Sequence, residues 1–175
     1  RVSGPGSREV VGPLVRLRRE MKAGRARFGE VVDAATGGVL DEVVVTYFAG
    51  PRSYTGEDVV EISGHGGQVP LRRILERLLE SGARLALPGE FTQRAFLNGK
   101  MDLAQAEAVG DMIAAQTEEA HQMAQRQGEG RLSGEVRKIR DLALGVLARI
   151  EASIDFPEDV GELDTALCDQ ELRRA

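Results

Sequence analysis

The residues best suited to do chemistry lie in one glycine-rich stretch, residues 47 to 67, which reads YFAGPRSYTGEDVVEISGHGG. Glu57, Asp58 and Glu61 lie close together in it, and His65 follows. On a strand, Glu57 and Glu61 would share one face, where a pair of carboxylates could act as general acid and base. The alternative is a group of solvated acids ahead of a strand. Loops of this composition commonly bind ligands.

The segment SGHGG, residues 63 to 67, lies between a predicted strand and a predicted helix. Backbone amides and a helix N-terminus at such a place can hold an anion, but the segment could equally be a tight turn that lets helix and strand pack closely. No GxxxxGK[ST] sequence occurs, and Val69 stands where GxGxxG requires its third glycine. The segment NGKMD, residues 98 to 102, has one residue too many for the guanine-reading NKxD. The sequence therefore predicts no nucleotide site of these kinds.

A second polar segment, PGEFTQRAF, holds Glu90, Thr92 and Arg94. Thr92 could cap the helix predicted there. Lys100 follows that helix at the junction between two parts of the chain, where it could meet the carboxylate of a ligand. Two histidines and the single cysteine, Cys168, are too few for a zinc site without many carboxylates.

Composition restricts the class of protein. One cysteine allows no intrachain disulfide and favours a reducing compartment. No run approaches the roughly 18 apolar residues of a membrane helix, and no signal peptide opens the chain, so we expect a cytoplasmic protein without a membrane partner. The chain starts without Met at what reads as the end of a strand, and it ends within a helical pattern, which indicates a fragment.

Charge is distributed unevenly along the chain, whose net charge is −5. Residues 1 to 27 hold eight Arg or Lys against two Glu, whereas residues 151 to 175 hold eight acids against two Arg. The whole chain is therefore not an electrostatic nucleic-acid binder. The two ends could be solvated helix faces, or the first could form a basic patch that holds an RNA or another polyanion.

The pattern of apolar residues predicts an α+β fold, with a mixed sheet and helices over residues 1–99 and a helical, bundle-like segment over residues 100–175. In the first part we expect helices at about 8–22, 71–82 and 91–97, and strands at 27–34, 39–48, 58–62 and 83–87. In the second part we expect helices over 101–128 and 133–155, with a third starting near residue 163.

Two long strings carry a family resemblance. PRSYTGEDVVEISGHGG, followed by ARLALPGEFTQRAFLNGKMDLAQAEAVGDMIAA, resembles the amino-terminal half of the MnmE (TrmE) family of tRNA-modifying GTPases. The later IEASIDFPED is similar to the helical region of the same family. The resemblance covers essentially the whole chain, and the strings are far longer than a short motif.

This resemblance implies a domain similar to the folate-binding domain of aminomethyltransferases, which forms homodimers and binds 5-formyltetrahydrofolate. A helical domain follows, into which a GTPase domain that needs GTP, potassium and magnesium is inserted. With the flavoprotein MnmG, the family adds an aminomethyl or carboxymethylaminomethyl group to the wobble uridine of certain tRNAs, and tetrahydrofolate supplies the one-carbon unit. The present chain departs from that pattern because it holds neither the GTPase domain nor the second half of the helical domain.

Three residues match the folate contacts of the family: Arg1 in RVSG, Glu61 in GEDVVE and Lys100 in FLNGK. One carboxylate can accept both the amino group and the ring N–H of a pterin, and Arg or Lys can meet the carboxylates of the folate tail. Leu87 stands where the family often has Arg, which could alter the edge of the pocket.

Three functions follow. The first is a folate-binding, dimer-forming module of a tRNA-modifying GTPase, with no complete catalytic centre of its own. The second is a free-standing aminomethyltransferase-like enzyme, against which the helical half argues. The third is a dimerisation scaffold that has lost folate binding, an alternative that Leu87 leaves open.

Overall fold

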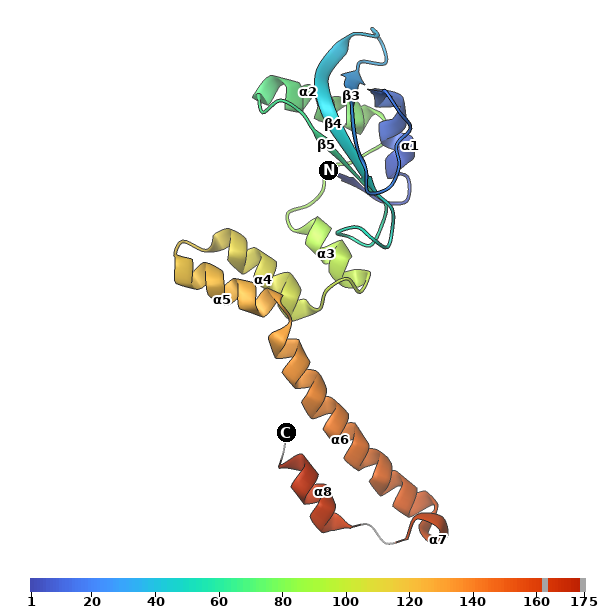
Figure 1. The fold of residues 1–175 in the computed structure, drawn as a ribbon, viewed down its shortest axis with the longest axis vertical. Helices are drawn as coiled ribbons and strands as arrows, with labels where there is room; N and C mark the ends of the chain where they lie inside the picture. The colour runs from blue at the N-terminus through green and yellow to red at the C-terminus, as the bar shows by residue number, and fades with distance from the viewer. Residues whose placement is uncertain (162–163, 174–175) are drawn as a thin grey trace. The chain divides into compact units, whose positions relative to one another are not determined.

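A computed structural model of the chain describes residues 1–161 and 164–173. The chain divides into two compact units, Arg1–Ala106 and Glu107–Ala175. The first unit is α+β and the second is helical (Figure 1). Within residues 1–161 and 164–173, no helix combines the length and apolar character that crossing a membrane would require.

The first unit is built on a five-stranded sheet with the order β1-β5-β4-β3-β2. Its strands are β1 (Val2–Ser3), β2 (Val15–Leu17), β3 (Ala26–Val32), β4 (Val39–Phe48) and β5 (Val59–Ser63). Every pair of neighbouring strands is antiparallel, so the expectation of a mixed sheet is wrong. The predicted strands at 27–34, 39–48 and 58–62 correspond to β3, β4 and β5.

One face of the sheet carries the core of the first unit. Alternate residues of β4 face it, and Val43 and Val45 there are buried beside Val31 of β3 and Val60 of β5. Helices α1 (Ser7–Val11) and α2 (Gln68–Glu80) cover this face, because Val11, Ile74 and Leu78 belong to the same cluster (Figure 1). Side chains of β3 and β4 on the other face, such as Phe28 and Val44, remain partly exposed.

The predicted helix over residues 8–22 is much shorter than expected. Helix α1 ends at Val11, a 3-10 turn covers Gly12–Leu14, and Val15 is already extended. Pro13 lacks the N–H that a continuing helix would need. Val15 and Leu17 pair instead with Val31 and Gly29 of β3, so pairing with a distant strand overrides the local helical pattern.

The predicted strand over residues 83–87 does not form. No residue of this segment joins the ladder of the described sheet. The N–H of Leu87 donates to the carboxylate of Glu90 at 2.8 Å, and Ala83 donates to Leu78 O at the end of α2. The neighbouring helices agree with prediction, as α2 and α3 (Glu90–Leu97) lie where the apolar spacing indicates.

The helical part contains α4 (Leu103–Ala114), α5 (Glu118–Gly128), α6 (Arg131–Asp155), α7 (Pro157–Val160) and α8 (Thr165–Leu172). The expected helix over 101–128 is interrupted, because the hydroxyl of Thr117 caps α5 by accepting from Ala120 N at 3.2 Å. The expected helix over 133–155 is confirmed as α6. The predicted start near residue 163 lies outside the described residues. Val146 of α6 and Cys168 of α8 are buried where these helices pack.

Candidate functional site

The sheet brings two of the predicted site residues together. Strand β1 pairs with β5 in a register that places Val2 opposite Val60, so Arg1 and Glu61 are neighbours across the strands. Both Nε and Nη2 of Arg1 lie 2.8 Å from Oε1 of Glu61. Both side chains remain partly exposed, so this ion pair stands at a surface where a ligand can reach it.

Two aromatic rings surround the Arg1 guanidinium. Its central carbon lies 5.4 Å from the centroid of the Tyr54 ring and 5.7 Å from that of Phe91. The Tyr54 hydroxyl is 2.9 Å from the hydroxyl of Thr92, which ties the glycine-rich loop to α3. The prediction that Thr92 caps this helix is wrong. Thr92 lies inside α3, and Gly89 occupies the N-cap position. Sequence reasoning missed both rings, although aromatic residues in a chain with only 4% of them were an available signal.

Lys100, the third predicted residue, binds the loop between β4 and β5, which also carries Tyr54. Its Nζ donates to Pro51 O at 2.9 Å, and its backbone N–H donates to Ala95 O just after α3. Gly56 has a φ of 79°, and a Cβ there would lie 3.2 Å from Lys100 Cγ. Among the described residues, Lys100 forms no hydrogen bond or ion pair with Arg1 or Glu61. Lys100 therefore binds the segment that carries Tyr54, but it does not join Arg1 and Glu61 in one cluster.

The structure does not bring Glu57 and Glu61 together as a carboxylate pair. Glu57 accepts from Arg94 Nη1 at 3.1 and 3.0 Å and from the Ser3 hydroxyl at 3.1 Å, whereas Glu61 is bound by Arg1. Asp58 accepts from the Tyr47 hydroxyl and the Gly50 amide. Each acid therefore has its own structural partner, and acid–base work by a pair of them has no geometric support.

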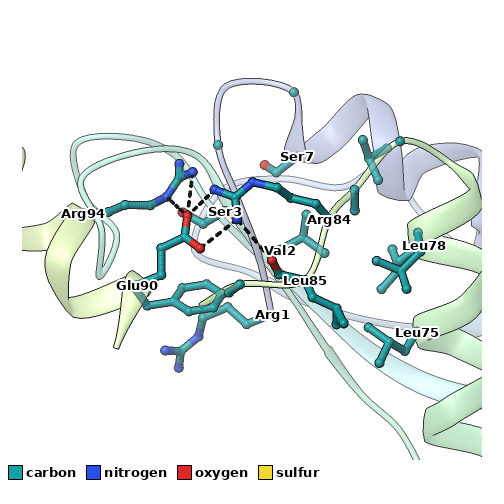
Figure 2. Close-up of a pocket in the computed structure, with 18 residues that line it drawn as sticks. Arg1, Val2, Ser3, Ser7, Leu75, Leu78, Arg84, Leu85, Glu90 and Arg94 are labelled. Carbon is teal, nitrogen blue, oxygen red and sulfur yellow. Dashed lines mark hydrogen bonds and ion pairs between the residues drawn. The ribbon is translucent and has the colours of Figure 1, made fainter. Parts of the chain in front are cut away.

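The buried Glu90 is the centre of a charge network with two arginines, of which Arg84 is 62% exposed and Arg94 is half-buried. Its carboxylate accepts from both Nη atoms of Arg84 and from Arg94 Nε at 3.1 Å (Figure 2). It also accepts from Leu87 N at 2.8 Å. The Arg84 guanidinium, followed by the Leu87 amide, lowers the pKa of Glu90 to about 2. This network fixes the start of α3 and the extended segment before it.

A cavity of about 500 Å³ adjoins this network. Its walls come from the first residues of the chain, α1, the end of α2 and residues 82–86 (Figure 2). Most of its lining is apolar, as at Val10, Leu78 and Leu85, and its arginines are bound to carboxylates. This cavity therefore offers no unpaired cation, among its described lining residues, to the carboxylates of a ligand.

The conformation of the SGHGG segment, residues 63–67, is fixed by contacts between His65 and Asp41 of β4. The buried Asp41 carboxylate accepts from His65 N at 2.8 Å and lies 2.7 Å from His65 Nδ1, while the imidazole is 73% exposed. A Cβ on Gly64 would collide with Asp41 Oδ2. Because a carboxylate of the protein already occupies the loop amide, the tight-turn interpretation is favoured over an anion site.

The contact between His65 and Asp41 raises the pKa of the histidine and lowers that of the aspartate. The hydrogen bond that the imidazole donates to Asp41, reinforced by the negative charge of that carboxylate, raises the pKa of His65. Burial alone would raise the pKa of Asp41, but the bonds from His65 outweigh it, so the Asp41 pKa lies below its usual value. The His65 contribution to stability is thus fully present below the ordinary histidine pKa and is lost as the pH rises through the folded-state value.

Asp41→Asn should lower the pKa of His65 towards the ordinary value of about 6.5, since the main cause of its elevation is removed. Titration of the His65 ring by NMR measures this directly. Glu42→Gln is the control, because Glu42 acts only through a weaker, longer-range attraction and should shift the pKa less. An unchanged His65 pKa in Asp41→Asn would contradict the assigned contact.

Comparison with known proteins agrees with the resemblance drawn from the sequence. The family model described as GTP-binding protein TrmE N-terminus matches residues 1–100, and the MnmE helical domain model matches residues 103–175. The chain belongs to the TrmE (MnmE) family, as predicted.

Several curated relatives bear the name tRNA modification GTPase MnmE. The protein of Alkaliphilus oremlandii is 45% identical over all of this chain and 39% of its own length. That of Carboxydothermus hydrogenoformans is 48% identical over 90% of this chain and 35% of its own length. That of Bacillus velezensis is 45% identical over 93% of this chain and 37% of its own length. The chain thus spans less than two fifths of the length of these relatives.

Proposed function

We propose that this chain is the folate-binding, homodimerising part of a cytoplasmic GTPase that modifies tRNA. Residues 1–99 would bind 5-formyltetrahydrofolate and form the dimer, and residues 100–175 would be the first part of the helical domain. Together with MnmG, the whole protein would add an aminomethyl or carboxymethylaminomethyl group to the wobble uridine. GTP, potassium and magnesium would act in the GTPase domain of the family, and residues 1–175 would hold no complete catalytic centre.

The observation that carries the folate proposal is the meeting of Arg1 and Glu61, which lie 60 positions apart in the sequence. Arg1 uses only Oε1 of Glu61, and within the described residues Oε2 has no hydrogen-bond partner. A pterin amino group and ring N–H could therefore bind this carboxylate side by side. The rings of Tyr54 and Phe91 beside Arg1 offer apolar faces to the flat pterin.

Lys100 would serve the other end of the ligand. Its ammonium group makes one hydrogen bond to a backbone carbonyl and, among the described residues, no ion pair, so its charge is not neutralised by a neighbouring carboxylate. A carboxylate of the folate tail could supply the missing countercharge. The Pro51–Gly56 segment, which contacts Lys100 and carries Tyr54, would then connect the two ends of the site.

Exposed apolar side chains near α2 and α3 are consistent with the proposed dimer. Leu85 and Leu87 are 61% and 68% exposed in the extended segment between α2 and α3. Leu71 and Leu75 of α2 are exposed as well. Large apolar side chains that gather on a protein surface commonly mark an interface. The dimer we propose would cover them.

Calorimetric titration of 5-formyltetrahydrofolate tests the site. Glu61→Ala should weaken binding at least tenfold, or about 1.4 kcal/mol, because the pterin loses its acceptor. Glu30→Ala is the matched control, since it removes another exposed carboxylate that pairs with an arginine across two strands, Arg16 at 3.0 Å. The oligomeric state is recorded in the same buffer.

The competing function is a dimerisation scaffold that binds no folate. The neutralisation of Arg1 by Glu61 favours it, because a satisfied ion pair has less to gain from a ligand. A folded dimer that binds no folate would reject the folate proposal and leave this scaffold, whereas equal weakening by Glu61→Ala and Glu30→Ala would place the ligand elsewhere.

A further inference from the structure

A basic loop connects β2 to β3 at the edge of the sheet. We define it as residues 16–27, with the sequence RLRREMKAGRAR. It contains six cations and one acid, Glu20, in a chain whose net charge is −5. The cations are Arg16, Arg18, Arg19, Lys22, Arg25 and Arg27. Such a density of like charge raises the free energy of the folded state through self-repulsion, unless a countercharge comes from outside.

The basic loop is held in place by its backbone. Gly24, with a φ of 69°, donates to Tyr47 O of β4 at 2.8 Å, and Arg25 N–H donates to Lys22 O at 3.2 Å. The side chain of Met21 is buried in the core of the first unit. These contacts fix the turn, so the neighbouring cations project from an ordered surface and not from a free tail.

Few of these charges are neutralised within the chain. Arg16 pairs with Glu30 across the strands, and the Arg27 guanidinium donates to the carbonyls of Glu20 and Ala26. In the part of the chain that the structure describes, Arg19, Lys22 and Arg25 form no ion pair. Their side chains are exposed, and the loop presents a group of unpaired cations to the solvent.

These cations surround two adjoining hollows. One of about 510 Å³ is lined by Arg19, Glu20, Lys22, Arg25 and Arg27. The second, of about 310 Å³, shares Arg19 and Glu20 with the first and adds Arg8 from α1. On the face of the sheet opposite the core, Arg18 lies 5.4 Å from the centroid of the partly exposed Phe28 ring. Cations that line neighbouring hollows suit successive phosphates of a nucleic-acid backbone, and an aromatic ring with an arginine suits a base.

We propose that the basic loop is an RNA-binding surface that contacts the phosphate backbone of the tRNA substrate. The identity of the RNA rests on the proposed function, whereas the surface rests on the charges and contacts of the loop. A lipid membrane fits less well. Interfacial membrane binding requires apolar side chains beside the cations, and the large apolar residues of the loop, Leu17 and Met21, are half-buried and buried.

Fluorescence anisotropy with a labelled, unmodified tRNA tests this surface. Arg19→Glu combined with Arg25→Glu should reduce affinity at least about tenfold at low salt, and should reduce the slope of log affinity against log salt by about 1.4–1.8 for two lost phosphate contacts. The matched control is Arg72→Glu with Arg73→Glu, which reverses two exposed arginines on α2 and should change the affinity less than about twofold.

Three further measurements separate a loss of charge in the loop from a loss of folding or of the folate site. Circular dichroism checks that the variants fold, and Arg19→Gln with Arg25→Gln should give a smaller loss of affinity in the same direction. Binding of 5-formyltetrahydrofolate should be unchanged in both loop variants. Unchanged tRNA affinity, equal losses in the loop and control variants, or binding of the loop to anionic phospholipid vesicles without tRNA binding would overturn the proposal.

Discussion

Glu90→Gln should lower the melting temperature more than any other single substitution of a carboxylate by its amide in the first unit. Glu90 is buried and accepts from Arg84, Leu87 and Arg94. A glutamine keeps the size of the side chain but turns an N–H group towards arginine donors and loses the negative charge. In the variant Arg84 would lose its acidic partner among the described residues, whereas Arg94 would keep its ion pair with Glu57. Removing the buried acceptor of such a network is destabilising because its donors lose the group that satisfied them.

The loss should depend on pH in a defined way. The pKa of Glu90 is about 2 in the folded protein, below its ordinary value of 4.5. A carboxylate with a lowered pKa contributes stability that is fully present above its unfolded-state pKa and is lost as the pH falls through the folded-state value. The difference in melting temperature should therefore be constant near neutral pH and should shrink between pH 4.5 and 2, where Glu90 itself becomes protonated.

Glu80→Gln provides the control for Glu90→Gln. Glu80 also pairs with an arginine, Arg77, but its side chain is exposed on α2. Exposed pairs of this kind contribute little, so this variant should melt close to the unchanged chain at every pH. Equal melting temperatures of Glu90→Gln and the unchanged chain at pH 7 would contradict the role of the network.

Gly29→Ala should destabilise the sheet by about 1–3 kcal/mol, because it overpacks a filled position. A Cβ on Gly29 would lie 2.5 Å from Arg16 O and 2.7 Å from Leu17 Cδ2. The backbone of β2 would have to move away from β3, and the start of the basic loop would move with it. Urea unfolding followed by circular dichroism measures the change in the free energy of unfolding.

Gly12→Ala is the matched control for Gly29→Ala. Gly12 has helical backbone angles, with a φ of −51°, and a Cβ there would meet nothing within 4 Å. This variant should be neutral or stabilising by up to about 1 kcal/mol, since alanine restricts the unfolded chain. If both variants were equally stable, crowding at Gly29 would not be the cause.

Local patterns predicted the elements that depend on local signals. The alternating residues of β4 place Val43 and Val45 on the buried face, and the apolar spacing of α2 places Ile74 and Leu78 there too. In both elements the periodicity of the sequence and the requirement for a core agree. The interruption at Thr117 had a local signal as well, because threonine is a common N-cap, but the helical spacing on both sides concealed it.

The remaining errors arise where another group binds the segment and prevents the expected element. Val15 and Leu17 fit a helix until β3 is there to pair with them. Residues 83–87 have the composition of a strand, but Arg84 and Leu87 are bound to Glu90, which lies further along the chain. A pattern of single residues does not show which group, whether near or distant in the sequence, will compete for a backbone N–H.

Some residues of the candidate site could be chosen from the sequence, and others could not. Arg1, Glu61 and Lys100 were chosen through a family resemblance, and the antiparallel register of β1 and β5 brings the first two together. Tyr54 and Phe91 were missed because they come from two segments whose approach depends on the whole sheet.

The small number of buried side chains in the helical part has a thermodynamic consequence. Among its described residues, only Ala108, Ala124, Val146 and Cys168 are buried, whereas α6 alone runs for 25 residues. Without much apolar area to bury, such a helix depends on its own nucleation and propagation. When residues 1–175 are studied by themselves, the first unit should therefore unfold cooperatively, while the ends of α6 fray in a gradual helix–coil equilibrium.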